Sequence, residues 1–279
     1  MNRLQARLLP DGQRLHLSDG PIDLVIEAWG ADRHRAYDAA IAAAQPVLDA
    51  LCAERPALSA SQPGPPLHGP VASAMQRAVA PHAGAFITPM AAVAGAVADH
   101  VLSAMVGAAA PTRAYVNNGG DIALHLAPGE AFDAAIAGLD GAVLGTVRLR
   151  GADGVRGIAT SGWPGRSFSL GIADSVTVLA ATAAGADAAA TVIANAVDLP
   201  GHPAIVRVPA NALQPGSDLG RRLVTRAVAP LSPQDRRAAL AAGAVVARCL
   251  VRAGLIAGAA LHLQGETVVD ATRGLRIET

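Results

Sequence analysis

Alanine dominates this sequence, and aromatic side chains are scarce. Of the 279 residues, 65 are Ala and only seven are Phe, Trp or Tyr. Ala favours helices but buries little apolar area, so the core must come from close approach of backbones and from Val, Leu and Ile. Because 52% of the residues are hydrophobic and 16% are charged, the chain is expected to fold. The length of 279 residues allows one large domain or two intimately packed ones, and we expect a single domain over residues 1–279.

The charged residues exclude several kinds of chemistry. All 22 basic residues are Arg, and they balance 22 acidic residues. Without Lys there can be no Schiff base, Lys general base or phosphate-loop Lys. The neutral balance and the lack of a basic block argue against nucleic acid or a membrane surface as a partner.

The sequence also predicts where the protein resides. Cys52 and Cys249 form neither a disulfide framework nor a metal-binding pattern, which favours a reducing compartment. Residues 1–7 carry no apolar segment typical of a secretory signal. The uncharged stretch at residues 78–98 spans 21 positions but is interrupted by Pro81 and Pro89 and is richer in Ala than in Leu or Ile. We therefore expect a soluble, cytoplasmic protein.

Patterning predicts an α+β fold in which largely antiparallel sheets are packed by Ala-rich helices. Turn residues separate short apolar runs, as antiparallel strands require. The predicted strands are 4–8, 14–17, 22–28, 113–116, 121–126, 132–137, 143–150, 155–159, 166–172, 175–180, 204–208, 255–263 and 267–271. The predicted helices are 36–53 with a bend near Pro46, 71–79, 90–105, 184–197 and 233–253. Residues 54–70, which are rich in Pro, are expected to form a surface connection.

The first candidate motif is Asn117-Asn118-Gly119-Gly120-Asp121, between two predicted strands. Asn-Gly supplies the positive φ of a tight hairpin turn. A glycine pair also lets backbone N–H groups approach a ligand closely, with Asp121 fixing the loop. Both interpretations remain open from the local sequence.

A second motif, Ala159-Thr160-Ser161-Gly162, ends a predicted strand. Its two hydroxyls can donate to a phosphate or carbonyl oxygen, or they can form a hydroxyl-capped turn. It is not a G-x-S-x-G elbow, and no His lies nearby in the sequence to activate Ser161, so a Ser nucleophile is disfavoured.

The third motif places Asp187 and Thr191 four residues apart, on one face of a predicted helix. A carboxylate and a hydroxyl suit Mg²⁺, which keeps waters and substrate phosphates among its ligands. The alternative is structural: Asp187 would complement the helix dipole and Thr191 would pack inward.

In their order along the chain, these motifs resemble the FAD:protein FMN transferase (ApbE) superfamily. The resemblance is strongest over residues 113–198. It is closest to a compact, uncharacterised branch of signal-less cytoplasmic proteins, whose signature the segment Phe86-Ile87-Thr88-Pro89-Met90 resembles. The transferases move FMN from FAD to a Thr hydroxyl of a partner protein.

The resemblance implies a two-lobed α+β fold that binds a flavin nucleotide (FAD) and Mg²⁺. It further implies a small nucleotide or phosphorylated ligand as partner, with a homodimer left open. The implied cofactor-binding residues are Asn118, Gly119, Gly120, Asp121, Thr160, Ser161 and Gly162. The implied metal ligands are Asp187 and Thr191.

One segment departs from the superfamily. After Ala-Thr-Ser-Gly the transferases have a His-containing segment that ends in Asp-Pro-x-Thr-Gly. Here residues 163–174 read WPGRSFSLGIAD, without His and without that turn. Whether the chain is an enzyme thus stays open between a transferase-type protein with an atypical active site and a non-catalytic binding or assembly protein that keeps the fold.

Overall fold

The computed structural model describes residues 3–61, 64–138, 143–272, 274–275 and 277–278. These residues form two compact units. Unit 1 comprises residues 1–132, 149–159 and 180–187, and unit 2 comprises residues 133–148, 160–179 and 188–279. The chain passes between the units several times, including at residues 159–160, 179–180 and 187–188. The predicted α+β class with largely antiparallel sheets is confirmed.

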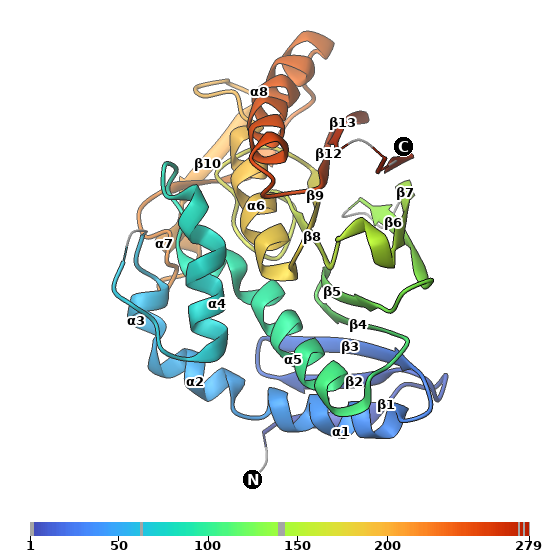
Figure 1. Ribbon diagram of the computed structural model, residues 1–279. Coiled ribbons are helices and arrows are strands. Elements are labelled where there is room, and N and C mark those ends of the chain that lie inside the picture. Colours follow the sequence, from blue (N-terminus) through green and yellow to red (C-terminus); the bar gives the residue numbers. More distant parts are fainter. Residues whose placement is uncertain (1–2, 62–63, 139–142, 273, 276, 279) are drawn as a thin grey trace. The chain divides into compact units, whose positions relative to one another are not determined.

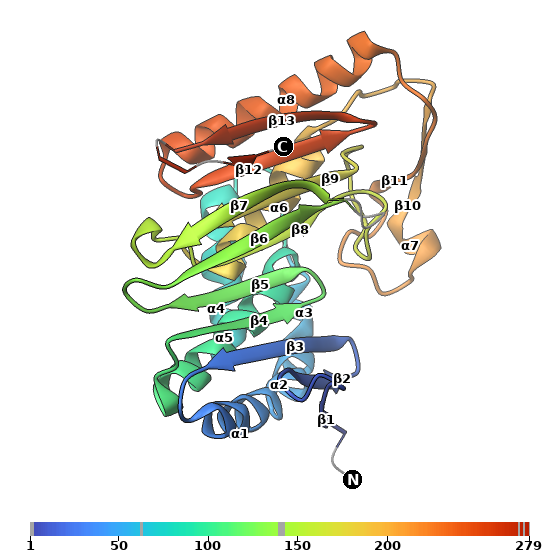
Figure 2. The ribbon, with the colours of Figure 1, turned by 90° about the vertical axis from the view of Figure 1, so that its right-hand side faces the viewer.

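Unit 1 is built on antiparallel strands that follow the order β1-β2-β3-β4-β5-β8. The sequence predicted these strands as short runs bounded by turn residues, and in β3, whose residues alternate between apolar and polar, every second side chain is buried. Figure 2 shows β3, β4 and β5 side by side, with helices covering one face. Their bounds are β1 Gln5–Leu8, β2 Leu15–Asp19, β3 Ile22–Trp29, β4 Arg113–Asn118, β5 Asp121–Leu126 and β8 Gly157–Ser161.

In unit 1, α5 packs on β4 and β5, while α1 and α4 pack on α5 (Figure 1). The single helix predicted over residues 36–53 with a bend near Pro46 is in fact two helices, α1 and α2, which are separated at that proline. The Pro-rich connection holds one helical turn, α3, that the sequence did not predict. A 3₁₀ turn, Pro89–Ala92, precedes α5. The bounds are α1 Arg33–Ala44, α2 Val47–Ala53, α3 Arg55–Leu58, α4 Pro70–Val79 and α5 Val93–Ala109, with further 3₁₀ turns at Ala80–His82 and Gly151–Asp153.

Helix α5 is the central helix of unit 1, in contact with α1, α4, β4 and β5. Together with its leading 3₁₀ turn it spans Pro89–Ala109, which is long and apolar enough by composition to cross a membrane. Its packing on other elements of the same unit accounts for the apolar composition equally well, because a core helix is apolar on most faces.

Unit 2 contains an antiparallel group β9-β12-β13 covered by α8, a ribbon β10-β11, and a group β14-β7-β6. Ser232 caps α8, since its hydroxyl accepts the Asp235 N–H. The bounds are β6 Ala131–Ala137, β7 Val143–Arg150, β9 Ser175–Ala180, α6 Ala183–Ala196, β10 Ile205–Pro209, α7 Ala210–Leu213, β11 Leu223–Val228, α8 Pro233–Arg252, β12 Gly258–Leu263, β13 Glu266–Ala271 and β14 Ile277–Glu278.

The structure corrects the sequence analysis at one strand and adds others. The strand predicted over residues 166–172 is wrong, because an amide side chain holds this backbone: Asn195 Oδ1 accepts Leu170 N–H at 2.9 Å and the Ser169 hydroxyl at 3.2 Å. Strands β11 and β14 and the short helix α7 were not predicted. Both cysteines are free and exposed.

Candidate functional site

The candidate site of unit 1 begins where the first turns of α5 and α6 meet. A Cβ on Gly95 would lie 2.3 Å from the Ala183 carbonyl oxygen, so only glycine lets the two backbones approach this closely. The sequence predicted close backbone packing from its Ala content, and this contact is an instance of it. Two helix N-termini, each with N–H groups that lack intrahelical partners, are thereby brought together.

Carboxylates from each helix satisfy the N–H groups of the other. Asp187 of α6 accepts the Gly95 N–H of α5 at 3.1 Å, and a further backbone hydrogen bond from Ala94. In return Asp99 of α5 accepts the N–H groups of Ala183 and Ala184 at 3.0 and 2.9 Å. Each helix therefore supplies the N-terminal cap of its neighbour.

The Asn118–Asp121 turn joins the same region. Gly119 and Gly120 have φ values of +66° and +112°, as a two-residue hairpin turn between β4 and β5 requires. Buried Asn118 donates its amide N–H to the Ala94 carbonyl of α5 at 3.1 Å. No heavy atom lies within 4 Å of where a Gly120 Cβ would be. The turn interpretation is thus correct, and the space beside Gly120 is open to a ligand.

The charges of Asp121 and Asp99 both act on Asp187, and we call these three carboxylates the carboxylate cluster. Burial raises the pKa of Asp187 well above its ordinary value, and the negative charges of Asp121 and Asp99 raise it further. Hydrogen bonds from Gly95 and Ala94 act in the opposite direction. Burial also raises the pKa of Asp99. Asp187 is therefore held where its negative charge is disfavoured.

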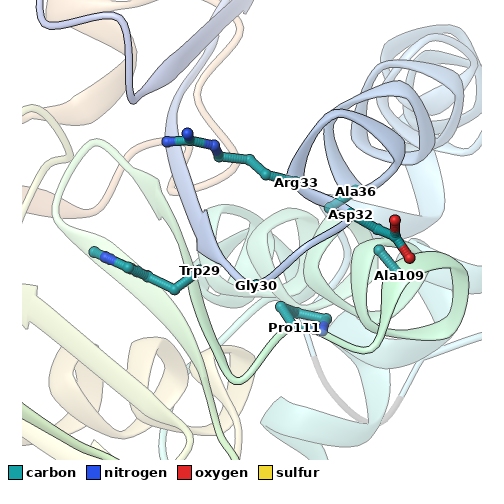
Figure 3. Close-up of a pocket in the computed structure, with 7 residues that line it drawn as sticks. All are labelled: Trp29, Gly30, Asp32, Arg33, Ala36, Ala109 and Pro111. Atoms are coloured by element: carbon teal, nitrogen blue, oxygen red, sulfur yellow. The ribbon is translucent and has the colours of Figure 1, made fainter.

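Two hollows of unit 1 are lined by other residues. The one drawn in Figure 3, between Trp29 and Pro111, offers no space to a water-sized molecule. A larger one, of about 660 Å³, lies beside Arg3, Asp19 and Asp49, where Arg3 pairs with both carboxylates. Neither hollow is lined by a residue that the sequence analysis selected. In the described part of the chain, no group of three His, Cys, Asp or Glu side chains is arranged to hold a metal ion.

The other predicted site residues belong to unit 2. Thr160 and Ser161 end β8, and the Thr160 hydroxyl lies 2.9 Å from that of Thr177. Gly162 packs so closely that a Cβ would lie 2.2 Å from the Asp174 carbonyl oxygen. Thr191 lies one helical turn beyond Asp187 on α6 and is partly buried.

Residues 163–174, which replace the His-containing segment, are held by their own polar contacts. Asp174 Oδ1 accepts the Trp163 indole N–H at 3.2 Å, and its other oxygen accepts the Gln264 N–H at 2.5 Å. The backbone N–H of Trp163 donates to the Ala173 carbonyl at 3.0 Å. Both oxygens of Asp174 are thus engaged in fixing the segment.

Sequence reasoning missed Asp99. It is the only acidic residue in the 17-residue helix α5, whose other residues are almost all apolar. A lone carboxylate on such a helix needs a partner when it is buried, and that signal could have identified it. The partner itself was not predictable, because it is 84 residues away in the sequence.

The comparisons with curated proteins gave relatives that bear the name UPF0280. The chain is 38% identical over 156 residues to one from Methanopyrus kandleri, which covers 53% of this chain and 59% of that protein. It is also 38% identical over 134 residues to one from Methanothermobacter thermautotrophicus, which covers 47% and 50%. The chain thus spans about half to three-fifths of the length of these relatives.

Among solved structures, the ApbE protein from Thermotoga maritima matches 68% of this chain and 52% of its own, with a TM-score of 0.40 and 16% identity. The family model described as "AbpE bacteria" matches residues 6–269, nearly the whole chain. The resemblance inferred from the motifs is confirmed at the level of the family. This chain belongs to the family described as "AbpE bacteria" and is ApbE-like.

Proposed function

We propose that this protein binds Mg²⁺ and a flavin nucleotide (FAD), with the metal held by Asp187 and the nucleotide lying along the Asn118–Asp121 turn. In this proposal it works in the cytoplasm, where its two exposed cysteines stay reduced. The family supports the ApbE-like part of the proposal. The metal and the nucleotide are argued from the side chains below.

The charge conflict around Asp187 carries the proposal. A partly buried carboxylate next to two others is costly unless a proton or a cation compensates its charge. Carboxylate and hydroxyl oxygens are ligands that Mg²⁺ prefers, and it needs only one or two carboxylates from the protein. The donors that are present therefore fit the metal.

A phosphorylated ligand would need that metal. Helix N-termini commonly bind phosphate through free N–H groups. Here Asp99 and Asp187 already accept those N–H groups on both helices, and the Thr182 hydroxyl accepts the next one, from Gly185. When bound, Mg²⁺ would neutralise the charge of the phosphates. Gly120 would leave its side of the ligand unobstructed.

The family resemblance adds residues whose roles need separate tests. It assigns Thr191 to the metal alongside Asp187, and Thr160, Ser161 and Gly162 to the nucleotide. The assignment of Thr160 is the least supported of these, because its hydroxyl already forms a hydrogen bond with that of Thr177. Variants Thr191→Val and Ser161→Ala remove one hydroxyl each and examine these assignments one at a time.

Titration with FAD in the presence and absence of Mg²⁺ tests the proposal. We expect Mg²⁺-dependent binding that Asp187→Ala weakens by more than about tenfold, since even outer partners of metal ligands cost that much. Asp235→Ala is the control, because it removes an acid near the start of another helix, α8. FAD binding that ignores both Mg²⁺ and Asp187→Ala would contradict the proposal.

A second candidate function, nucleotide binding without FMN transfer, is favoured by residues 163–174. A positioned base contributes on the order of 10²–10⁴-fold to attack by a hydroxyl. The segment contains no His, and Asp174 is the acid nearest in sequence to that missing group. Its carboxylate already accepts two N–H groups, which leaves it poorly placed to take a proton.

Mass spectrometry of a co-expressed Thr-bearing acceptor separates nucleotide binding alone from nucleotide binding followed by FMN transfer. We expect FAD binding with little FMN addition to the acceptor. Near-complete FMN addition would show that another base serves, and Asp174→Asn would then reveal whether it is Asp174.

A further inference from the structure

The reciprocal caps of α5 and α6 follow one spacing rule. Asp99 lies four residues after Gly95, whose N–H is accepted by Asp187. Asp187 lies four residues after Ala183, whose N–H is accepted by Asp99. In each helix, a first-turn N–H and a carboxylate one turn later face the same neighbouring helix.

The two caps act on one contact. Gly95 and Ala183 are the residues at which the backbones touch, and they are also the donors to the two carboxylates. A shift of the α6 N-terminus along α5 would therefore lengthen both sets of hydrogen bonds together. The orientation of Asp187 depends on where α6 begins, and Asp99 holds that beginning with two N–H contacts.

We propose that Asp99 is a positioning residue that fixes Asp187 by anchoring the first turn of α6. The link to metal binding rests on the proposed function, in which Asp187 holds Mg²⁺. The mechanical link between the two caps does not depend on it. Asp99 thus acts through Asp187 and does not itself bind the ligand.

Amide hydrogen exchange without metal tests the mechanical link. In Asp99→Asn the amide can accept only one of the two N–H groups, so exchange at Ala183 and Ala184 speeds up. The proposal predicts that the Gly95 amide, which Asp187 accepts, also exchanges about fivefold faster, the effect of losing one cap. Val116 in the core of β4 reports global unfolding and corrects for it.

Ser232→Ala is the matched control, since it removes the N-cap of α8. It should lower stability by a similar amount without changing exchange at Gly95. If Asp99→Asn speeds exchange at Ala183 and Ala184 but leaves Gly95 unchanged, Asp99 caps only its own partner and the proposal is overturned. Asp99→Ala removes both acceptor oxygens and should speed exchange at these amides further, provided that the variant folds. If it does not fold, Asp99→Asn alone provides the test.

Calorimetric titration with MgCl₂ tests the consequence for the metal. We expect Asp99→Asn to weaken Mg²⁺ binding by about tenfold, as loss of an outer partner typically does, and Ser232→Ala to leave it unchanged. Unchanged affinity in Asp99→Asn, with stability reduced, would show a purely structural role. If the unaltered protein binds no Mg²⁺, the proposed function fails, and hydrogen exchange alone decides the link between the caps.

Discussion

The carboxylate cluster of unit 1 and residues 163–174 of unit 2 both contain partly buried acids, but the surroundings of these acids differ. Asp174 gives each of its oxygens one N–H donor and lies in no acidic group that the described residues reveal. Asp187 also accepts N–H groups, yet it lies within the electrostatic reach of Asp121 and Asp99. Hydrogen bonding alone therefore does not distinguish a structural acid from a functional one.

Like charges held together do make that distinction. The mutual repulsion of the carboxylates opposes folding even though Asp99 and Asp187 each cap a helix, and such a cost makes the region a candidate for binding a compensating ligand. In residues 163–174 no such cost is visible, because every contact described there also stabilises the segment. The first region is thus the better candidate for a binding site.

The largest loss of stability that we expect comes from the close backbone contact at a glycine beside each of the two regions. Gly95→Ala and Gly162→Ala should each destabilise the protein by about 3 kcal/mol or more, because the new Cβ would overlap backbone atoms at 2.3 and 2.2 Å. Thermal or urea unfolding measures this. Gly107→Ala in α5, with nothing within 4 Å, is the control and should stabilise by up to about 1 kcal/mol. A mild effect at Gly95 would mean that the helices can separate without loss.

Removing one charge should affect the two regions to different extents. Asp174→Asn turns an acceptor into an NH₂ group that faces an N–H donor, which should cost about 1–3 kcal/mol. Asp187→Asn also loses one acceptor oxygen, but it removes the repulsion from Asp121 and Asp99, so without metal it should cost clearly less than Asp174→Asn. Urea denaturation in EDTA compares them. If both variants lose stability alike, the regions do not differ in the way described.

The pH dependence of stability sharpens the same contrast. The pKa of Asp187 is raised in the folded state, so the folded protein binds this proton more tightly than the unfolded chain does. Its contribution to stability is therefore greatest at low pH and declines as pH rises from about 4, the ordinary Asp value, to the folded pKa. Subtracting the curve of Asp187→Asn isolates this decline. Added Mg²⁺ should reduce it, and a difference curve that rises with pH would refute the sign.

The smallest effect concerns the open side of the turn. Gly120→Ala meets no neighbouring atom but places a side chain at φ +112°, which should cost about 1–2 kcal/mol. If a nucleotide lies against Gly120, FAD affinity should fall beyond what the stability loss explains. Gly201→Ala, at φ +76° and also without neighbours, is the control and should leave affinity unchanged.

The sequence predicted local features of this fold better than contacts between distant residues. The alternating apolar residues of 22–28 identified β3, and Pro46 indicated where the helical segment is interrupted, because both signals are local. Residues 166–172 were mistaken for a strand because their backbone is held by Asn195, which no local pattern reveals. The Asn-Gly turn was predictable from φ preferences, whereas its link to Ala94 was not.

For the candidate site the same limit applies. Asp187 was selected for its spacing to Thr191, and its bond to Gly95 lies 92 residues away in the sequence. The pairing with Asp99 required the crossing of two helices to be known. Spacing within one helix is visible in a sequence, but the donor that a carboxylate meets on another helix is not.

The exchange of caps between α5 and α6 has a consequence for how the family can vary. Loss of either acid leaves N–H groups unsatisfied on the other helix, so a single substitution at position 99 or 187 is penalised on a helix that it does not alter. We expect relatives to keep or to lose the two acids together, along with the small residues at 95 and 183 that permit the crossing. Replacing both acids would require new caps at the starts of both helices at once.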